Sequence, residues 1–154
     1  RELVDKIKET VLTHGRRNIL NSPEEAKPFH ARKKILVAED TKINRFMIVE
    51  MLRKLGDYQI LEAQNGQEAV VLFEAEQPDI VFLDLQMPVM NGFEAHTRMV
   101  DLAAAAQWRR PKFVAVTAFA MEEDRTRVLD AGIDLFLPKP YKKEDIRDAL
   151  EKLL

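Results

Sequence analysis

Five polar residues share one feature of the sequence, because each stands where a short apolar run ends. They are Glu39, Asp40, Asp84, Thr117 and Lys139. A short apolar run bounded by turn residues is typical of a strand that is buried in a parallel sheet. In open α/β sheets, ligands bind just outside the carboxyl ends of the strands. The five side chains are therefore predicted to meet in one shallow pocket.

The types of these five residues suit the chemistry of a phosphoryl group. Three clustered carboxylates repel one another, and a hard cation such as Mg²⁺, which prefers oxygen ligands, removes that conflict. A threonine hydroxyl and a lysine ammonium group suit the outer oxygens of a phosphoryl group, and an aspartate can act as a covalent nucleophile. Each residue alone has an ordinary explanation as a cap, a helix-start charge or a surface lysine. Their coincidence at four strand ends favours a common site.

The rest of the chain supplies the elements that would position these residues. Apolar runs at 35–38, 59–63, 80–83, 113–116 and 135–137 alternate with five amphipathic segments. This alternation predicts an α/β fold, a parallel sheet with right-handed crossovers that cover both of its faces. In a doubly wound sheet of flavodoxin-like (βα)5 type, with strand order 2-1-3-4-5, the first and third strands would be neighbours at the switch point. The first helix is predicted to bury one face, and Gly132 is predicted to cap a later helix. The residues expected on that buried face are Ile43, Met47, Met51 and Leu55, with Ile48 and Leu52 alongside.

Composition excludes several classes of function. The chain has 154 residues, no cysteine and a formal net charge of −2, so thiolate chemistry and a globally basic nucleic-acid surface are not expected. No apolar run approaches the roughly 20 residues that span a bilayer. We expect a cytoplasmic domain at residues 31–154, preceded by a helical segment and linker at residues 1–30. Because the first residue is not methionine, we expect either a processed form or, in preference, a fragment of a longer protein.

These residues and their surroundings resemble the receiver domain of two-component response regulators. The resemblance covers roughly Lys33 to Leu154. The motifs that carry it are Glu39-Asp40, the stretch from Asp84 through Met87-Pro88 and Met90 to Gly92, Thr117-Ala118 and Lys139-Pro140. It implies a signalling domain that is not itself an enzyme and that takes a phosphoryl group from a histidine kinase or a histidine phosphotransfer protein.

The resemblance also implies a role for each site residue. Asp84 would be the phosphoacceptor, and Thr117 and Lys139 would contact the phosphoryl group. The implied Mg²⁺ ligands are Asp40, Asp84, the backbone carbonyl of Gln86 and, through water, Glu39. Phe136 would occupy the aromatic switch position on the face formed by the fourth helix, the fifth strand and the last helix.

Finer details are similar to the receivers of hybrid histidine kinases. They include Asn44, the stretch from Met87 to Gly92, and Thr117 to Met121; Asn91 stands where an aspartate is common. We therefore expect the C-terminal receiver of a hybrid kinase, with a stand-alone phosphorelay regulator as the alternative. An unphosphorylated binding module is a further alternative. An aspartyl-phosphate hydrolase is disfavoured, because Gln86 replaces the second aspartate that such enzymes use as an acid and base.

Overall fold

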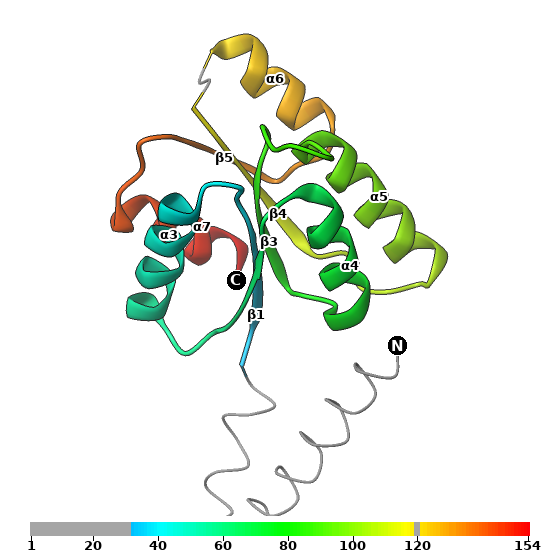
Figure 1. The fold of residues 1–154 in the computed structure, drawn as a ribbon, viewed down its shortest axis with the longest axis horizontal. Helices are drawn as coiled ribbons and strands as arrows, with labels where there is room; N and C mark the ends of the chain where they lie inside the picture. Colours follow the sequence, from blue (N-terminus) through cyan, green and yellow to red (C-terminus); the bar gives the residue numbers. More distant parts are fainter. Residues whose placement is uncertain (1–31, 119–120) are drawn as a thin grey trace, which may run out of the picture. The chain divides into compact units, whose positions relative to one another are not determined.

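A five-stranded parallel sheet with helices on both faces forms the core of the fold (Figure 1). The computed structural model describes residues 32–118 and 121–154, so the predicted segment and linker at residues 1–30 lie outside it. The strands are β1 (Lys34–Ala38), β2 (Gln59–Ala63), β3 (Ile80–Asp84), β4 (Lys112–Thr117) and β5 (Leu135–Pro138). They are hydrogen-bonded in the order β2-β1-β3-β4-β5. The predicted fold class and strand order are confirmed.

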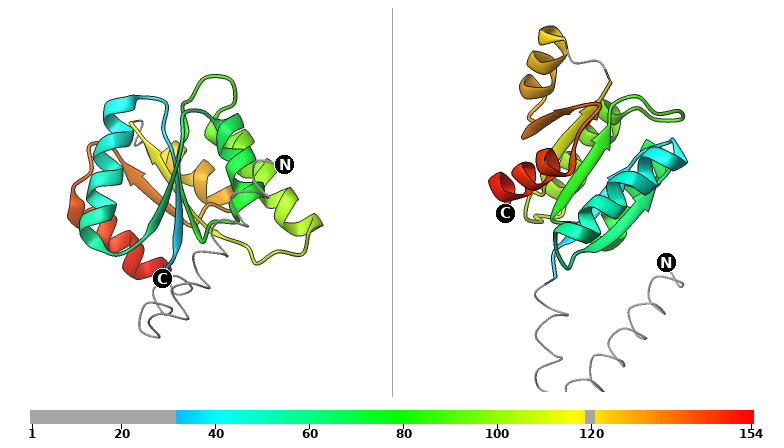
Figure 2. Two further views of the ribbon diagram at one scale, coloured as in Figure 1. Left: turned by 60° about the horizontal axis from the view of Figure 1, so that its bottom comes forward. Right: turned by 90° about the vertical axis from the view of Figure 1, so that its left-hand side faces the viewer.

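Five helices in the described residues connect and cover the strands. They are α3 (Lys42–Leu55), α4 (Gly66–Glu76), α5 (Gly92–Ala105), α6 (Glu122–Asp130) and α7 (Lys143–Leu153). Successive side chains of a strand point to opposite faces of the sheet, so the alternate residues of β1 enter two different cores. Leu36 belongs to the core that includes residues of α4, α5 and α6, whereas Ile35 belongs to the core that includes residues of α3 and α7. Figure 2 shows these two layers of helices on opposite sides of the sheet.

Side-chain capping and glycine fix the ends of several helices. Asn65 and Asn91 accept hydrogen bonds from the backbone N–H groups of Glu68 and Glu94, at the starts of α4 and α5. An asparagine at this position satisfies a backbone donor that has no partner inside the helix. Gly132, just past α6, has a φ of 87°. This left-handed conformation after a helix end agrees with the predicted glycine cap.

The predicted buried face of the first helix is wrong at its N-terminal end. Ile43 and Met47 are 66% and 47% exposed, whereas Ile48, Val49 and Leu52 are almost fully buried. The sheet therefore covers a stripe of α3 that is rotated away from the expected one. The helix has more apolar residues than one face can bury, so periodicity alone did not select the covered stripe.

Candidate functional site

The pairing of β1 with β3 brings Glu39 and Asp84 together at the carboxyl edge of the sheet. Ala38 is in register with Leu83, so Glu39 and Asp84 follow on adjacent strands. Both side chains are buried, with 5% exposure each. Asp84 is the last residue of β3 rather than the first residue after it. The two carboxyl groups thus lie at the switch point of the sheet, where the order of strands reverses.

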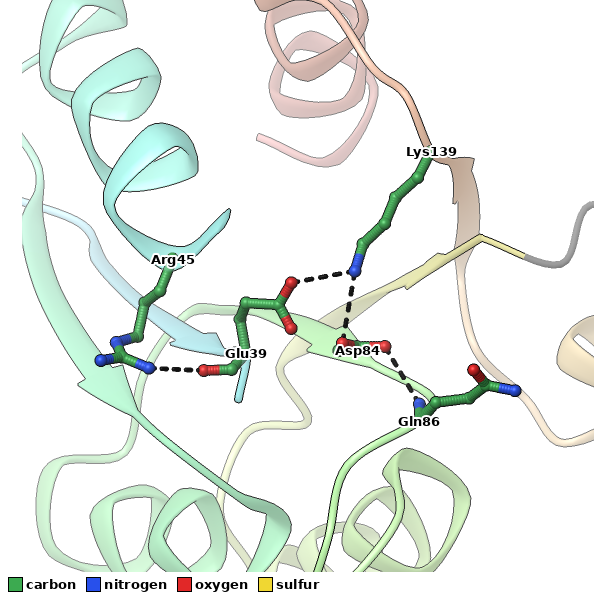
Figure 3. A network of polar contacts seen from close by, with 5 residues as sticks. All are labelled: Glu39, Arg45, Asp84, Gln86 and Lys139. Atoms are coloured by element: carbon green, nitrogen blue, oxygen red, sulfur yellow. Dashed lines mark hydrogen bonds and ion pairs between the residues drawn. The ribbon is translucent and has the colours of Figure 1, made fainter. Parts of the chain in front are cut away.

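Lys139 joins these two carboxylates from the far side of the pocket. Its Nζ donates to Glu39 Oε1 at 2.9 Å and to Asp84 Oδ2 at 3.3 Å (Figure 3). Lys139 follows β5, and its backbone N–H donates to the carbonyl oxygen of Thr117 at 2.8 Å. Residues 100 positions apart in the chain are therefore held in one ionic network.

Asp40 completes a group of three acids. One carboxylate oxygen from each of Glu39, Asp40 and Asp84 lies within 4.8 Å of the others. Glu39 Oε2 is buried and accepts no hydrogen bond from the described residues. A buried oxygen without a donor is costly, and a cation would satisfy it. The all-oxygen donor set and this unsatisfied atom both fit Mg²⁺.

Burial and mutual repulsion control the charges in the pocket. Burial raises the pKa of Glu39 above its usual value, Asp84 raises it further, and Lys139 only partly opposes these effects. For Lys139, burial lowers the pKa, but the hydrogen bond to Glu39 and the charges of Asp84 and Glu39 outweigh burial, so its pKa is raised. Lys139 is therefore a firmly protonated cation between two acids. The pocket holds more negative charge than this one ammonium group neutralises.

The loop after β3 orients Asp84. Its Oδ1 accepts a hydrogen bond from the backbone N–H of Gln86 at 3.0 Å. The start of α5 packs tightly against the end of β3, since a Cβ added to Gly92 would lie 2.5 Å from the carbonyl oxygen of Asp84. Any larger residue at this position would displace backbone atoms beside the acid. One carboxylate oxygen of Asp84 is thus fixed by the loop, and the other faces Lys139.

Thr117 and Phe136 lie on neighbouring strands beside this cluster. Thr117 is the last residue of β4 and is 2% exposed. Phe136 lies on β5 and pairs with Ala115 of β4. Its half-buried ring packs against the core on the side of the sheet covered by α4, α5 and α6, with the guanidinium group of Arg125 over the ring. The structure therefore brings Glu39, Asp40, Asp84 and Lys139 into mutual contact, with Thr117 adjoining them through Lys139 and Phe136 on the strand that leads to Lys139.

Two residues at the site were missed by sequence reasoning. Arg45 is buried in the first turn of α3, and its Nη1 donates to the carbonyl oxygen of Glu39 at 2.7 Å. Tyr141 lines the same region as Glu39 and Asp84, and burial raises the pKa of its phenol, which keeps it protonated. An arginine five residues after Asp40 on an amphipathic helix was the available signal, but it is also typical of an exposed helical residue.

Comparison with known proteins gives a consistent family assignment. The family model for the response regulator receiver domain matches residues 35–151. The chain belongs to this family. The assignment confirms the resemblance expected from the sequence motifs, and receiver domains of this family are signalling modules of two-component systems.

Relatives of this receiver domain occur in proteins of very different length. It is 36% identical over 122 residues to the hybrid signal transduction histidine kinase A of Dictyostelium discoideum, covering 79% of this chain and 6% of that protein. It is 30% identical to the chemotaxis protein CheY of Halobacterium salinarum, covering 79% of this chain and 97% of that protein. The chain thus spans only a small part of the hybrid kinases that it matches.

A solved structure of a relative contains a metal ion in its own active site cleft. It is the receiver domain of the sensor histidine kinase PA1611 from Pseudomonas aeruginosa, with a magnesium ion coordinated in its active site cleft. The identity is 32% and the TM-score is 0.69, with coverage of 80% of this chain and 98% of that one. Receiver domains thus bind Mg²⁺ at an acidic site, and an acidic group of this composition is present here.

Among the described residues, none of the helices has the length and the apolar composition needed to span a membrane.

Proposed function

We propose that Asp84 accepts a phosphoryl group from a phosphohistidine in a reaction that depends on Mg²⁺. The observation that carries this proposal is the Lys139 ammonium group, which contacts both Glu39 and Asp84 beside Asp40. Asp84 is the acid of this group at the end of the central strand β3. A nucleophile there has a cation on one side and acidic cation ligands on the other, which is the arrangement that phosphoryl transfer requires.

The reaction would be a simple displacement at phosphorus. A carboxylate oxygen of Asp84 attacks the phosphorus atom, the new O–P bond forms, the P–N bond of phosphohistidine breaks, and the imidazole leaves with the bonding electron pair. Lys139 already contacts Asp84, and its ammonium group would bind the outer oxygens of the phosphoryl group during the transfer. Bound Mg²⁺ would neutralise negative charge on those oxygens, held by Asp40, Asp84, the carbonyl of Gln86 and, through water, Glu39.

Phosphorylation would be read out through Thr117 and Phe136. A phosphoryl group on Asp84 brings acceptor oxygens near the end of β4, and the Thr117 hydroxyl would move toward them. The ring of Phe136 would then shift and alter the face formed by α6, β5 and α7. A modification shifts such an equilibrium only through its different interaction energy with the two states.

A hybrid histidine kinase is the context that we infer for this receiver domain, because several relatives are hybrid kinases. A stand-alone phosphorelay regulator is the second candidate, favoured by the nearly full-length match to CheY. The partner would be a histidine kinase or a histidine phosphotransfer protein, and no nucleic-acid partner is proposed. We also propose that residues 31–154 are the receiver domain in the cytoplasm and that residues 1–30 are a separate segment.

Intact-mass measurement after incubation with Mg²⁺ and acetyl phosphate tests the proposed acceptor. The wild-type chain should gain one phosphoryl group, and Asp84→Asn should gain none while keeping the wild-type circular dichroism spectrum. Asp101→Asn, at an exposed position on α5, is the matched control and should behave as the wild type. A phosphoryl group on Asp84→Asn would disprove the assignment. An absence of the adduct in the wild type would favour the binding-module alternative, and rapid turnover of acetyl phosphate would favour the hydrolase.

A further inference from the structure

Arg45 is a buried cation that touches the acidic cluster without contacting any of its carboxylate oxygens. It lies in the first turn of α3 and is 9% exposed. Its Nη1 donates to the backbone carbonyl oxygen of Glu39 at 2.7 Å (Figure 3), and its Nε lies 3.4 Å from Glu62 Oε1 on β2. A buried guanidinium group is expected only where it is paired and hydrogen-bonded. The hydrogen bond to the Glu39 carbonyl is therefore the contact that explains why this cation is buried here.

The hydrogen-bond ladder between β1 and β2 ends at Glu39. The N–H of Glu39 donates to the carbonyl oxygen of Ala63 at 3.0 Å, and Ala63 is the last residue of β2. Beyond that point the chain turns into α4, so β2 no longer runs alongside β1. Arg45 supplies the donor for the Glu39 carbonyl that a longer β2 would have supplied. The side chain thus continues the ladder by one bond.

The hydrogen bond from Arg45 constrains the backbone of both Glu39 and Asp40. The carbonyl of Glu39 belongs to the peptide group that links Glu39 to Asp40, and a peptide group is planar. Fixing the carbonyl therefore fixes the directions in which both residues leave that plane. The carboxylate oxygens of these two residues lie with one of Asp84 within 4.8 Å of one another. A small rotation of the peptide would separate them.

We propose that Arg45 is a positioning residue for the cation site, acting through the peptide between Glu39 and Asp40. This inference depends on the proposed binding of Mg²⁺ by the acidic cluster. Arg45 supplies no ligand and touches no reacting atom. Its contribution is to hold two acidic residues in the geometry that the cation requires, as groups that support metal ligands commonly do. Glu62 forms an ion pair with the Nε side of the guanidinium group, and because its side chain is 47% exposed this pair contributes less.

Cation affinity in the full chain tests this role. Isothermal titration with MgCl₂ compares the wild type, Arg45→Met, Arg45→Lys and Asp40→Asn. Methionine keeps an unbranched apolar stem but has no donor, so its Kd for Mg²⁺ should rise by about tenfold or more. Lysine retains one donor and should recover part of the affinity. Arg53→Met, on the exposed face of the same helix, is the matched control and should bind Mg²⁺ as the wild type does.

The rate of phosphorylation by acetyl phosphate separates positioning from general damage. Arg45→Met should react slowly at low Mg²⁺ and approach the wild-type rate when Mg²⁺ is saturating. A merely structural defect would lower the rate at every Mg²⁺ concentration. If Arg45→Met fails to fold, Arg45→Gln replaces it, because the shorter amide cannot span the same distance to the carbonyl.

Each outcome bears on one proposal. If Asp40→Asn binds Mg²⁺ as tightly as the wild type, the cation site itself is wrongly placed, and the Arg45 proposal fails with it. If Asp40→Asn loses affinity but Arg45→Met does not, the cation site stands and only the role of Arg45 is overturned. A loss in Arg45→Met that lysine does not relieve at all, and that saturating Mg²⁺ does not relieve, also overturns it.

Discussion

At the scale of single residues, burial determines the charge of groups that look ordinary in the sequence. Glu39 has a raised pKa because it is buried beside Asp84, although it is hydrogen-bonded to Lys139.

His96, on α5, has a pKa that is shifted in the opposite direction. It is 4% exposed, its ring packs edge-on against Phe113 with 4.6 Å between ring centroids, and its Nε2 has no hydrogen-bond partner among the described residues. Burial lowers the pKa of His96 below the usual 6.5, with the positive charge of Arg110 adding to the effect and Asp134 opposing it.

A dependence of stability on pH follows from His96. The unfolded chain protonates this histidine near pH 6.5, whereas the folded protein does so only at lower pH. Between the pKa of His96 in the unfolded chain and its lower pKa in the folded protein, the unfolded state binds more protons. The free energy of unfolding should therefore fall as the pH falls below 6.5. His96→Leu should remove this component. Urea unfolding of both proteins without metal gives the free energy of unfolding at about pH 7.5 and at about pH 5.5. The contribution of His96 is the difference between the two proteins in the stability lost over this pH interval.

Subtraction of the variant from the wild type cancels the other titrating groups, including Glu39. The leucine variant should lose less stability than the wild type over this interval. Identical losses in the two proteins would show that His96 does not carry the effect.

At the scale of elements, α3 separates apolar residues that are buried from apolar residues that are exposed. Leu52 is fully buried between the helix and the sheet, whereas Met47 is 47% exposed. The two residues lie on the same helix and have similar sizes. They therefore form a matched pair for measuring what the sheet covers.

Alanine substitution at these two positions should give very different costs. Leu52→Ala removes a buried side chain and leaves a cavity, and it should lower the free energy of unfolding by about 3 kcal/mol. Met47→Ala should change it by no more than about 0.5 kcal/mol, as is usual for surface positions. Alanine is the best helix former, so helix propensity does not penalise either variant. Equal costs measured by urea unfolding would mean that the covered stripe of α3 is the one that periodicity predicted.

At the scale of the whole molecule, the acidic cluster joins segments from both ends of residues 33–154. Glu39 follows β1 and Lys139 follows β5, and the two are in contact. Ligand binding at such a place stabilises the fold as a unit, because the unfolded chain cannot hold the three acids together.

Addition of Mg²⁺ should therefore raise the melting temperature. At about 100 times the Kd, a ligand that binds only the native state adds about 2.7 kcal/mol. Asp40→Ala should remove most of the shift, since it deletes one of the three clustered acids that are proposed to hold the cation. The measurement is thermal unfolding by circular dichroism with MgCl₂ or with EDTA. An equal shift in the wild type and in Asp40→Ala would place the cation elsewhere.

The strand order followed from the resemblance to a known family, whereas the sequence alone determined the fold class and the residues of the acidic cluster. These follow from local rules, since a buried parallel strand needs a continuous apolar run, and functional residues gather where such strands end. The pattern around Asp84 and Lys139 was specific enough to identify the family before the geometry was known.

Only the tertiary structure decided which side of α3 is covered, which atoms Lys139 contacts and what Arg45 does. The physical reason is that these features depend on the relative placement of elements. An amphipathic helix with surplus apolar residues has several stripes of similar hydrophobicity, and the neighbouring sheet selects among them. The proposed role of Arg45 depends on β2 ending at Ala63, which accepts from the N–H of Glu39 but leaves the carbonyl of Glu39 without a donor from the strand. No periodicity in the sequence records where a neighbouring strand turns away.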